Sequence, residues 1–309
     1  MKPVRLRDFI RDNNGWYYAV AAYDNASTVG SVLRYIPDPA GDRADGSGIR
    51  YRKVEFEEAY RLIAEHHPDW AGLVHRVPHN QITAVFKPDE AIETIAAQHP
   101  KVAKLVKALH LPPCSFGVTG SLLCGLGGKN SDIDGVVYGP AFRHAQKQLI
   151  RSIQNGSVEE LSEDLWKTVY KKRNPDTSYE EFLLHEKRKL NRGQVDGTYF
   201  DLLYTRSYQD LPGFTMEKGT ILGKRVIEAI VTDDQFAFDS PAVYEIDHPE
   251  ISRVLSFTHT YTGQVFTGEQ LQAQGIVEQH GNEQWLVVGT TREAKGEYIR
   301  SLSLLEQEG

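Results

Sequence analysis

The stretch "GSLLCGLGGKNSDIDGVV", residues 120–137, decides how this sequence is interpreted. It begins with a Gly-Ser pair, runs through a glycine-rich loop, and delivers Asp132 and Asp134 directly before an apolar run. On a strand, residues i and i+2 point to the same face. Two carboxylates at this spacing repel each other, which raises the pKa of one of them unless a cation compensates the charge.

The residue types around the two aspartates favour a site for a metal ion and phosphate. Mg²⁺ takes carboxylate oxygens and keeps coordination positions open for phosphate and water. The backbone N–H groups of a glycine-rich loop can approach phosphate oxygens closely, and Ser121 adds a hydroxyl donor. The stretch therefore predicts a metal–triphosphate site.

The same residues resemble the signature of the DNA polymerase beta nucleotidyltransferase superfamily. That signature combines a Gly-Ser pair, a spacer of about the ten residues found here, and an acidic-x-acidic motif. The matching residues are Gly120, Ser121, Ser131, Asp132 and Asp134. Gly135 departs from the pattern, because many members carry a large apolar residue there. The resemblance covers about residues 88–212, and the whole chain is similar to uncharacterised nucleotidyltransferase-domain proteins of prokaryotes such as archaea.

The superfamily uses a third carboxylate from a later strand. "YFDLLY", residues 199–204, offers Asp201 in such an apolar setting, whereas Asp196 precedes a glycine and is better explained as a turn residue. The resemblance implies that Asp132, Asp134 and Asp201 are the catalytic metal ligands. They would hold two Mg²⁺ ions, or Mn²⁺ in their place, in a two-metal mechanism.

The resemblance also implies which residues contact the nucleotide. Gly120 and Ser121 would hold the β- and γ-phosphates. Lys129 and Ser131, which lie in and after the glycine-rich loop, are further candidates for nucleotide binding. A loop lysine is also compatible with simple solvation, so this alternative for Lys129 stays open.

Changes of pattern along the chain predict an α/β (α+β) protein with three parts. Residues 1–87 are expected to form an N-terminal α/β module. Residues 88–212 would be the nucleotidyltransferase domain, with a mixed sheet and helices, including a helical pair broken at Pro100. Residues 213–309 show short strands with turn signals, which favours a β-rich barrel or sandwich. A short helix over residues 292–307 is expected to close the chain.

A basic segment lies between residues 167 and 192, with eight basic residues against four acidic ones. Its densest part is "HEKRKLNRG", residues 185–193, where His185, Lys189 and Arg192 have helical spacing. Lys187, Lys189 and Arg192 are candidates for contacts with an acceptor or with phosphate. The alternative is a solvated helix face with ordinary ion pairs.

Composition limits the remaining possibilities. The chain has 309 residues, 40% hydrophobic residues, two cysteines and a net charge of −7. Two cysteines are too few for a disulfide framework. No apolar run approaches the roughly 18–20 residues of a membrane helix, and the N-terminus lacks the apolar centre of a signal peptide, so we expect a cytoplasmic protein without a membrane partner.

These features predict a magnesium-dependent nucleotidyltransferase that binds an NTP, ATP among the candidates. It would move an NMP to an acceptor hydroxyl and release pyrophosphate. The basic segment favours RNA binding and an RNA 3′ end as acceptor. Nucleotidylation of a small molecule or a protein side chain is the alternative, and a non-enzymatic nucleotide- or RNA-binding protein is a third hypothesis. The sequence does not determine the oligomeric state.

Overall fold

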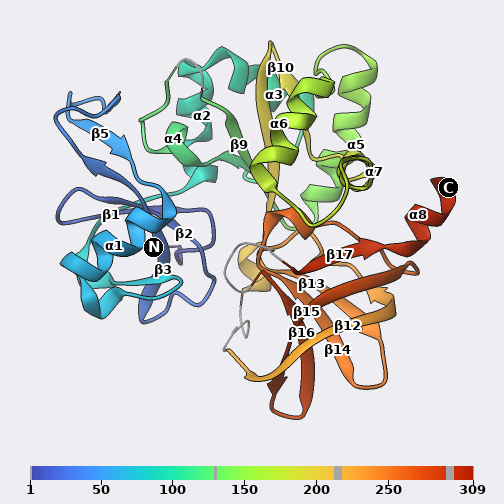
Figure 1. Ribbon diagram of the computed structural model, residues 1–309. Coiled ribbons are helices and arrows are strands. Elements are labelled where there is room, and N and C mark those ends of the chain that lie inside the picture. The colour runs from blue at the N-terminus through green and yellow to red at the C-terminus, as the bar shows by residue number, and fades with distance from the viewer. Residues whose placement is uncertain (1, 129–130, 212–217, 290–295, 309) are drawn as a thin grey trace. The chain divides into compact units, whose positions relative to one another are not determined.

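The computed structural model describes residues 2–128, 131–211, 218–289 and 296–308 (Figure 1). They form two compact units. The first takes its described residues from 1–160 and 191–216, and the second from 161–190 and 217–309. The chain therefore enters the second unit, returns to the first, and leaves it again. The domain boundaries expected after residues 87 and 212 stay predictions.

The N-terminal part of the first unit is an antiparallel sheet. Its strands are β1 (Phe9–Asp12), β2 (Tyr17–Val20), β3 (Thr28–Pro37), β4 (Arg43–Ala44), β5 (Arg50–Lys53), β6 (His75–Pro78) and β7 (Ile82–Phe86). They lie in the order β4-β5-β3-β2-β1-β7, and β6 also pairs with β3. Helix α1 (Phe56–His66) buries Leu62 and Ile63, which belong to the same core as Tyr18 and Leu33.

The central part of the first unit is a four-stranded sheet in the order β10-β11-β9-β8. The strands are β8 (Phe116–Val118), β9 (Ile133–Tyr138), β10 (Arg192–Val195) and β11 (Thr198–Thr205). The pair β9–β11 is parallel and the other two pairs are antiparallel, so the sheet is mixed, as predicted.

Four helices accompany this mixed sheet. They are α2 (Pro88–Gln98), α3 (Pro100–Leu109), α4 (Gly120–Leu123) and α5 (Ala141–Gln154). The predicted break between the first two falls at Pro100, which begins α3. Proline suits a first helical position because its missing N–H would have no partner there.

The second unit contains the yellow-green helices α6 and α7 and the orange-to-red strands of Figure 1. Its elements are α6 (Glu163–Arg173), α7 (Tyr179–Arg188), β12 (Thr220–Asp233), β13 (Ala242–Asp247), β14 (Ile251–Ser256), β15 (Gln270–His280), β16 (Glu283–Val288), β17 (Tyr298–Ser301) and α8 (Leu302–Glu308). Ser162 and Ser178 cap α6 and α7 by accepting backbone N–H groups of the first turn. No helix in the described part of the chain has both the length and the apolar character that crossing a membrane requires.

The strands of the second unit close into a barrel. They run in the order β12-β13-β14-β16-β15, and β15 pairs back onto β12. The pair β14–β16 is parallel, and the other pairs of the ring are antiparallel. Counted from β12, this is the strand order 1-2-3-5-4-1 of an OB-fold barrel. Of the two predicted alternatives, a barrel or a sandwich, the structure forms the barrel, with β17 added at one end of β15.

Two predictions about local structure are wrong. Residues 298–301, expected in a helix, form β17, where Ile299 and Ser301 are buried in alternation and pair with β15. The basic helix also ends earlier than its pattern suggests, at Arg188. Leu190 has a φ of 50°, which stops a right-handed helix, and Arg192 starts strand β10 instead. His185, Lys189 and Arg192 therefore do not share one helix face.

A buried histidine connects α7 to β17 in the second unit. The His185 ring lies 2.8 Å through Nδ1 from the backbone oxygen of Glu181, and Nε2 lies 3.0 Å from the backbone nitrogen of Ser301. Since the Ser301 N–H can only donate, Nε2 accepts and Nδ1 carries the proton. Burial lowers the pKa of His185 to about 4, so the neutral ring is the form that fits this site.

Acidification is expected to destabilise the second unit through His185. The unfolded histidine binds a proton below about pH 6.5, whereas the folded one does so only near pH 4. The free energy of unfolding therefore falls across this window, by roughly 3 kcal/mol for a shift of this size. Urea denaturation at pH 7 and pH 4.5 should show a smaller pH effect in His185→Gln than in the wild type. Equal pH effects in wild type, His185→Gln and the exposed-site control His144→Gln would contradict this.

Candidate active site

Two of the predicted carboxylates lie on neighbouring strands at directly opposite positions. In the parallel pair of β9 and β11, Asp134 is the register partner of Asp201. Opposite residues of paired strands project to the same face of a sheet. Asp134 is half-buried and Asp201 is buried, while Asp132 is exposed and immediately precedes β9. The structure therefore brings Asp134 and Asp201 together from distant parts of the sequence.

A buried arginine flanks Asp201 on its other side. Arg192 of β10 is the register partner of Asp201, and its Nε lies 2.5 Å from Asp201 Oδ1. Burial works against the charged guanidinium, but the carboxylate of Asp201 outweighs it and raises the pKa of Arg192. Arg192, proposed from the sequence as an acceptor or phosphate contact, is thus an ion-pair partner of Asp201.

The start of the glycine-rich loop lies against Asp134. The Thr119 N–H donates to the backbone oxygen of Asp134 at 2.9 Å. Gly120 follows with a φ of 70°, and an ideal Cβ at this position would lie 2.7 Å from Asp134 Oδ2. A side chain at residue 120 would therefore be strained and would collide with the carboxylate. The first residue of the Gly-Ser pair keeps its backbone next to the acidic site.

The two serines of the motif brace the loop that separates them. Ser121 Oγ lies 3.3 Å from Ser131 Oγ, and Ser131 Oγ accepts the Gly128 N–H at 2.9 Å. The hydroxyls thus tie the beginning of the loop to its end. Lys129, a candidate for phosphate contact, lies outside the described residues.

Gly135, the departure from the superfamily pattern, has a packing reason. An ideal Cβ there would lie 2.9 Å from Phe116 Cε2 and 3.2 Å from the backbone oxygen of Asp201. A large side chain would push against the ring from β8 and against β11 beside its aspartate. The glycine therefore allows the two strands that carry the carboxylates to pack with Phe116.

The N-terminal sheet supplies a residue near the site that sequence reasoning missed. Arg43 Nη1 donates to the backbone oxygen of Leu126 in the glycine-rich loop at 3.0 Å. The Arg43 guanidinium also lies over the ring of Tyr35, with Cζ 5.6 Å from the ring centre, and burial raises the pKa of this tyrosine to about 12. Arg43 lies in a polar Gly/Pro/Asp loop sequence without a motif. No local signal could have connected it to a loop more than eighty residues away.

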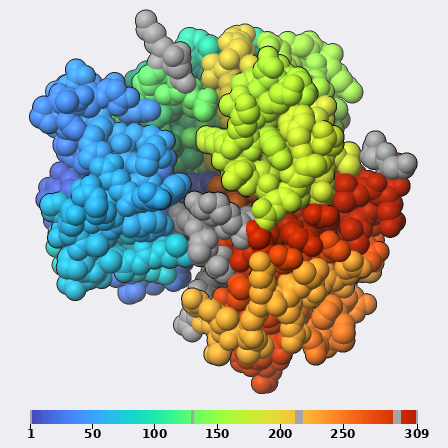
Figure 2. All heavy atoms as spheres, viewed as in Figure 1, coloured from blue at the N-terminus to red at the C-terminus, as the bar shows by residue number. Residues whose placement is uncertain are grey.

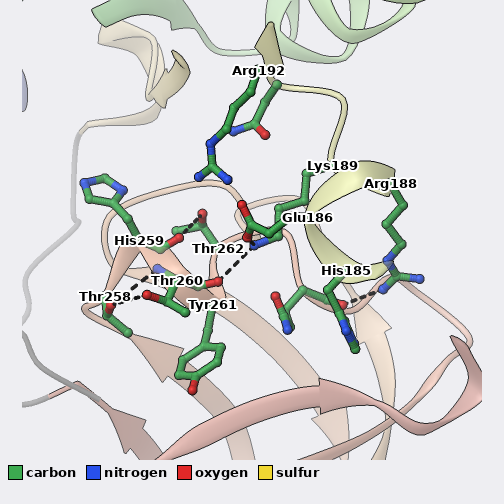
Figure 3. Close-up of polar contacts among 12 residues, drawn as sticks. His185, Glu186, Arg188, Lys189, Arg192, Thr258, His259, Thr260, Tyr261 and Thr262 are labelled. Atoms are coloured by element: carbon green, nitrogen blue, oxygen red, sulfur yellow. Dashed lines mark hydrogen bonds and ion pairs between the residues drawn. The ribbon is translucent and has the colours of Figure 1, made fainter. Parts of the chain in front are cut away.

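The other two basic candidates have different environments. Lys187 is exposed on α7. Lys189 is fully buried within the second unit, where it pairs with Glu186 and donates to the backbone oxygen of Thr260 at 2.9 Å (Figure 3). Because its ammonium is enclosed by these partners, Lys189 stabilises the packing of α7 on the barrel.

The acidic residues fit a hard divalent cation by their chemistry. All three candidates are carboxylates, and Asp134 and Asp201 share a face of the sheet. In the described part of the chain, however, no three His, Cys, Asp or Glu side chains form a group that could hold a metal ion. The contact of Asp201 with Arg192 accounts for this in part, since it directs one carboxylate oxygen toward a guanidinium.

Comparison with known proteins shows which family the chain belongs to. A model described as "Nucleotidyltransferase domain" matches residues 99–192. The uncharacterized protein MJ1086 of Methanocaldococcus jannaschii is 37% identical over 335 aligned positions, which cover 96% of this chain and 98% of that protein. The chain belongs to a family of nucleotidyltransferase-domain proteins. No solved structure matches it.

The nucleotidyltransferase domain match includes the Gly-Ser pair and both aspartates of the Asp-x-Asp motif. It ends at residue 192, before Asp201. The resemblance to nucleotidyltransferases is therefore confirmed, and general nucleotidyl transfer is the activity it supports. The assignment of individual site residues stays a prediction, and for Asp201 it rests on the register of β9 and β11.

Replacing Arg43 by alanine should weaken NTP binding. The change removes a charged donor from the Leu126 carbonyl, and such hydrogen bonds contribute about 1.5–3 kcal/mol. If the loop must be held in place to bind phosphate, the Kd for a fluorescent NTP analogue should rise about tenfold or more. Arg50→Ala is the matched control, because Arg50 donates to the Gly41 carbonyl within the same sheet region. Equal affinities of the two variants would contradict a role for Arg43.

Proposed function

We propose that this protein transfers an NMP from an NTP to an acceptor hydroxyl in a Mg²⁺-dependent reaction that releases pyrophosphate. The observation that carries the proposal is the register of β9 and β11, which sets Asp134 opposite Asp201. The backbone of Gly120 lies directly against the Asp134 carboxylate. Acidic ligands and a glycine-rich loop are thereby adjacent, as a metal–triphosphate substrate requires.

Asp132, Asp134 and Asp201 are the residues that would hold the metal, with Mn²⁺ as a possible substitute. When bound, two such ions stabilise the charge on the transferred phosphoryl group and lower the pKa of the attacking hydroxyl. Arg192 has a separate part in this proposal. It compensates the charge of Asp201 when Asp134 is also ionised, so the two neighbouring carboxylates tolerate each other before any ion arrives.

The loop residues would orient the triphosphate. The candidate donors are the backbone N–H groups that follow Gly120, whose backbone lies against the Asp134 carboxylate, and the hydroxyl of Ser121. Ser131 ties the end of the loop to Ser121, and Arg43 anchors Leu126 between them. Donors that are held in place before the substrate binds need no reorganisation during the reaction, which is how such sites stabilise developing charge.

Asp134→Asn should reduce pyrophosphate release by about a hundredfold or more. The substitution removes a metal-binding charge whose electrostatic effect on the transition state is of the order of several kcal/mol, at about 1.4 kcal/mol per tenfold in rate. Pyrophosphate release is measured with Mg²⁺ and each NTP in turn, and circular dichroism checks the fold.

Asp196→Asn is the control for this experiment. Asp196, which its sequence context explains as a turn residue, is exposed and pairs with Lys104 at 2.5 Å. Its variant should keep the wild-type rate. A wild-type rate in Asp134→Asn would show that the acidic site has been placed wrongly.

For the acceptor, we propose an RNA 3′ end bound with the help of α6 and α7. Lys167, Lys171, Lys172 and Lys187 are exposed on these helices. The barrel is less suited to a phosphate backbone, since residues 217–309 hold seven basic against fifteen acidic residues. The ring of Trp285 is not open for stacking on a base. The ring centre of His280 lies 3.7 Å from its ring centre, and the Arg253 guanidinium lies 4.8 Å from it. An RNA would therefore follow the helices.

Replacing Lys171 and Lys172 by glutamate should weaken binding of single-stranded RNA and lower its salt dependence. Each lost phosphate contact reduces the slope of log K against log salt by about 0.7 for single strands. Filter binding at several salt concentrations measures both quantities. Lys107→Glu, a reversal of an exposed charge on α3, is the control. Salt-independent or unchanged binding would favour the alternative, a small molecule or protein side chain as acceptor.

A further inference from the structure

Exposed apolar side chains are concentrated on one strand of the barrel. Among the described residues, four of the nine large hydrophobic side chains that are exposed belong to β12. They are Ile221 (57% exposed), Leu222 (49%), Val226 (54%) and Ile230 (44%). Apolar side chains that are scattered singly need no explanation, but a row along one strand marks an interaction surface.

The same strand presents a backbone edge. Thr220 to Ile230 of β12 pair with β15 on one side. On the other side β13 begins to pair only at Ile230, and no strand of the described chain pairs with residues 220–229 there. Figure 1 shows β12 as a long orange-yellow strand, and its atoms form part of the surface in Figure 2. An exposed edge of this length is a template for pairing with another chain.

We propose that β12 is the interface of a homodimer, in which residues 223–229 of two copies pair edge to edge and antiparallel about a twofold axis at Val226. This inference does not depend on the proposed function. It joins the β12 strands of two barrels into a continuous sheet. The partner it commits to is a second copy of this chain, and the argument for that partner is the charge pattern of the strand itself.

The pattern is complementary to itself in only one register. With the axis at Val226, the outward-facing Lys224 of one copy lies opposite Glu228 of the other, twice, and the two valines meet at the centre. Shifting the axis to residue 225 sets Arg225 against its own copy, and shifting it to residue 224 does the same for Lys224. Opposite charges across strands stabilise a pair, whereas like charges directly opposite destabilise it.

Contacts within the chain keep these charged groups on the outer face of β12, where Lys224 Nζ lies beside Gly296. Glu228 accepts a hydrogen bond from Gln272 of the adjacent β15 at 2.8 Å, which holds its carboxylate on the outer face. Arg225 pairs with Glu250 at 2.6 Å. A lysine on a strand edge ordinarily discourages pairing with other chains. In the proposed dimer, Glu228 of the second copy compensates the charge of Lys224. A partner strand without an acidic residue at this position would leave the lysine charge uncompensated.

Charge-swapped variants test the register directly. Lys224→Glu and Glu228→Lys should each weaken dimerisation about tenfold or more, because both symmetry-related pairs become repulsive. The double variant Lys224→Glu/Glu228→Lys should restore it. Analytical ultracentrifugation over a wide range of protein concentrations gives the dissociation constants. A wild-type protein that stays monomeric up to the highest concentration, or a double variant as weak as the single ones, would overturn the proposal.

A cross-link provides an independent readout. Antiparallel partners have Cα atoms about 4.5–5.5 Å apart, within the range that a disulfide spans. Val226→Cys should therefore form a disulfide-linked dimer under mild oxidation, in a Cys114→Ser background that removes the exposed native thiol. Lys224→Cys in the same background is the matched control, because its copy would lie four positions along the strand. Equal cross-linking at both positions, or none at residue 226, would contradict the axis.

Discussion

The parallel pairing of β9 with β11 is the constraint on which the proposed active site depends. It sets Asp134 opposite Asp201, while the antiparallel pairing of β10 sets Arg192 on the far side of Asp201. Two carboxylates and one guanidinium thus form a row across three strands. The buried Arg192 makes the acidic pair tolerable, because it neutralises the member that is removed from water. A slip of one residue would turn Asp201 to the opposite face of the sheet and separate the pair.

Glycines and long-range hydrogen bonds adapt the surroundings to this row. Gly120 brings backbone next to Asp134 where a Cβ would collide, and Gly135 makes room for Phe116 beside the strand that carries Asp201. From the N-terminal sheet, Arg43 holds the glycine-rich loop by the carbonyl of Leu126. The N-terminal sheet therefore also helps to hold the glycine-rich loop in place. Membership in a family of nucleotidyltransferase-domain proteins supports general nucleotidyl transfer, and the proposed NTP site is consistent with it.

The second unit has a different physical character. Residues 217–309 hold seven basic and fifteen acidic residues, whereas the much shorter α6 and α7 together hold six basic residues. Counting charges alone does not predict which lysines can contact a ligand. Lys189 belongs to the basic segment, but it is buried inside the unit, where it pairs with Glu186 and donates to the backbone oxygen of Thr260. The strand β12, with its exposed apolar side chains, gives the unit a surface that suits a protein partner better than a polyanion.

The sequence by itself determined the features that local chemistry specifies. The Gly-Ser pair, the Asp-x-Asp motif and the break at Pro100 each depend on residues that are neighbours in the chain. Asp201 was proposed from the family resemblance and its apolar strand setting, and its role stays a prediction; its position opposite Asp134 was not foreseen. Only the tertiary structure decided the pairing of Arg192 with Asp201, the contact of Arg43 with the loop, and the strand identity of residues 298–301. These three features depend on which distant segments pair and in which register. Hydrophobic periodicity predicts that a segment is a strand, but it does not predict which distant strand will be its neighbour.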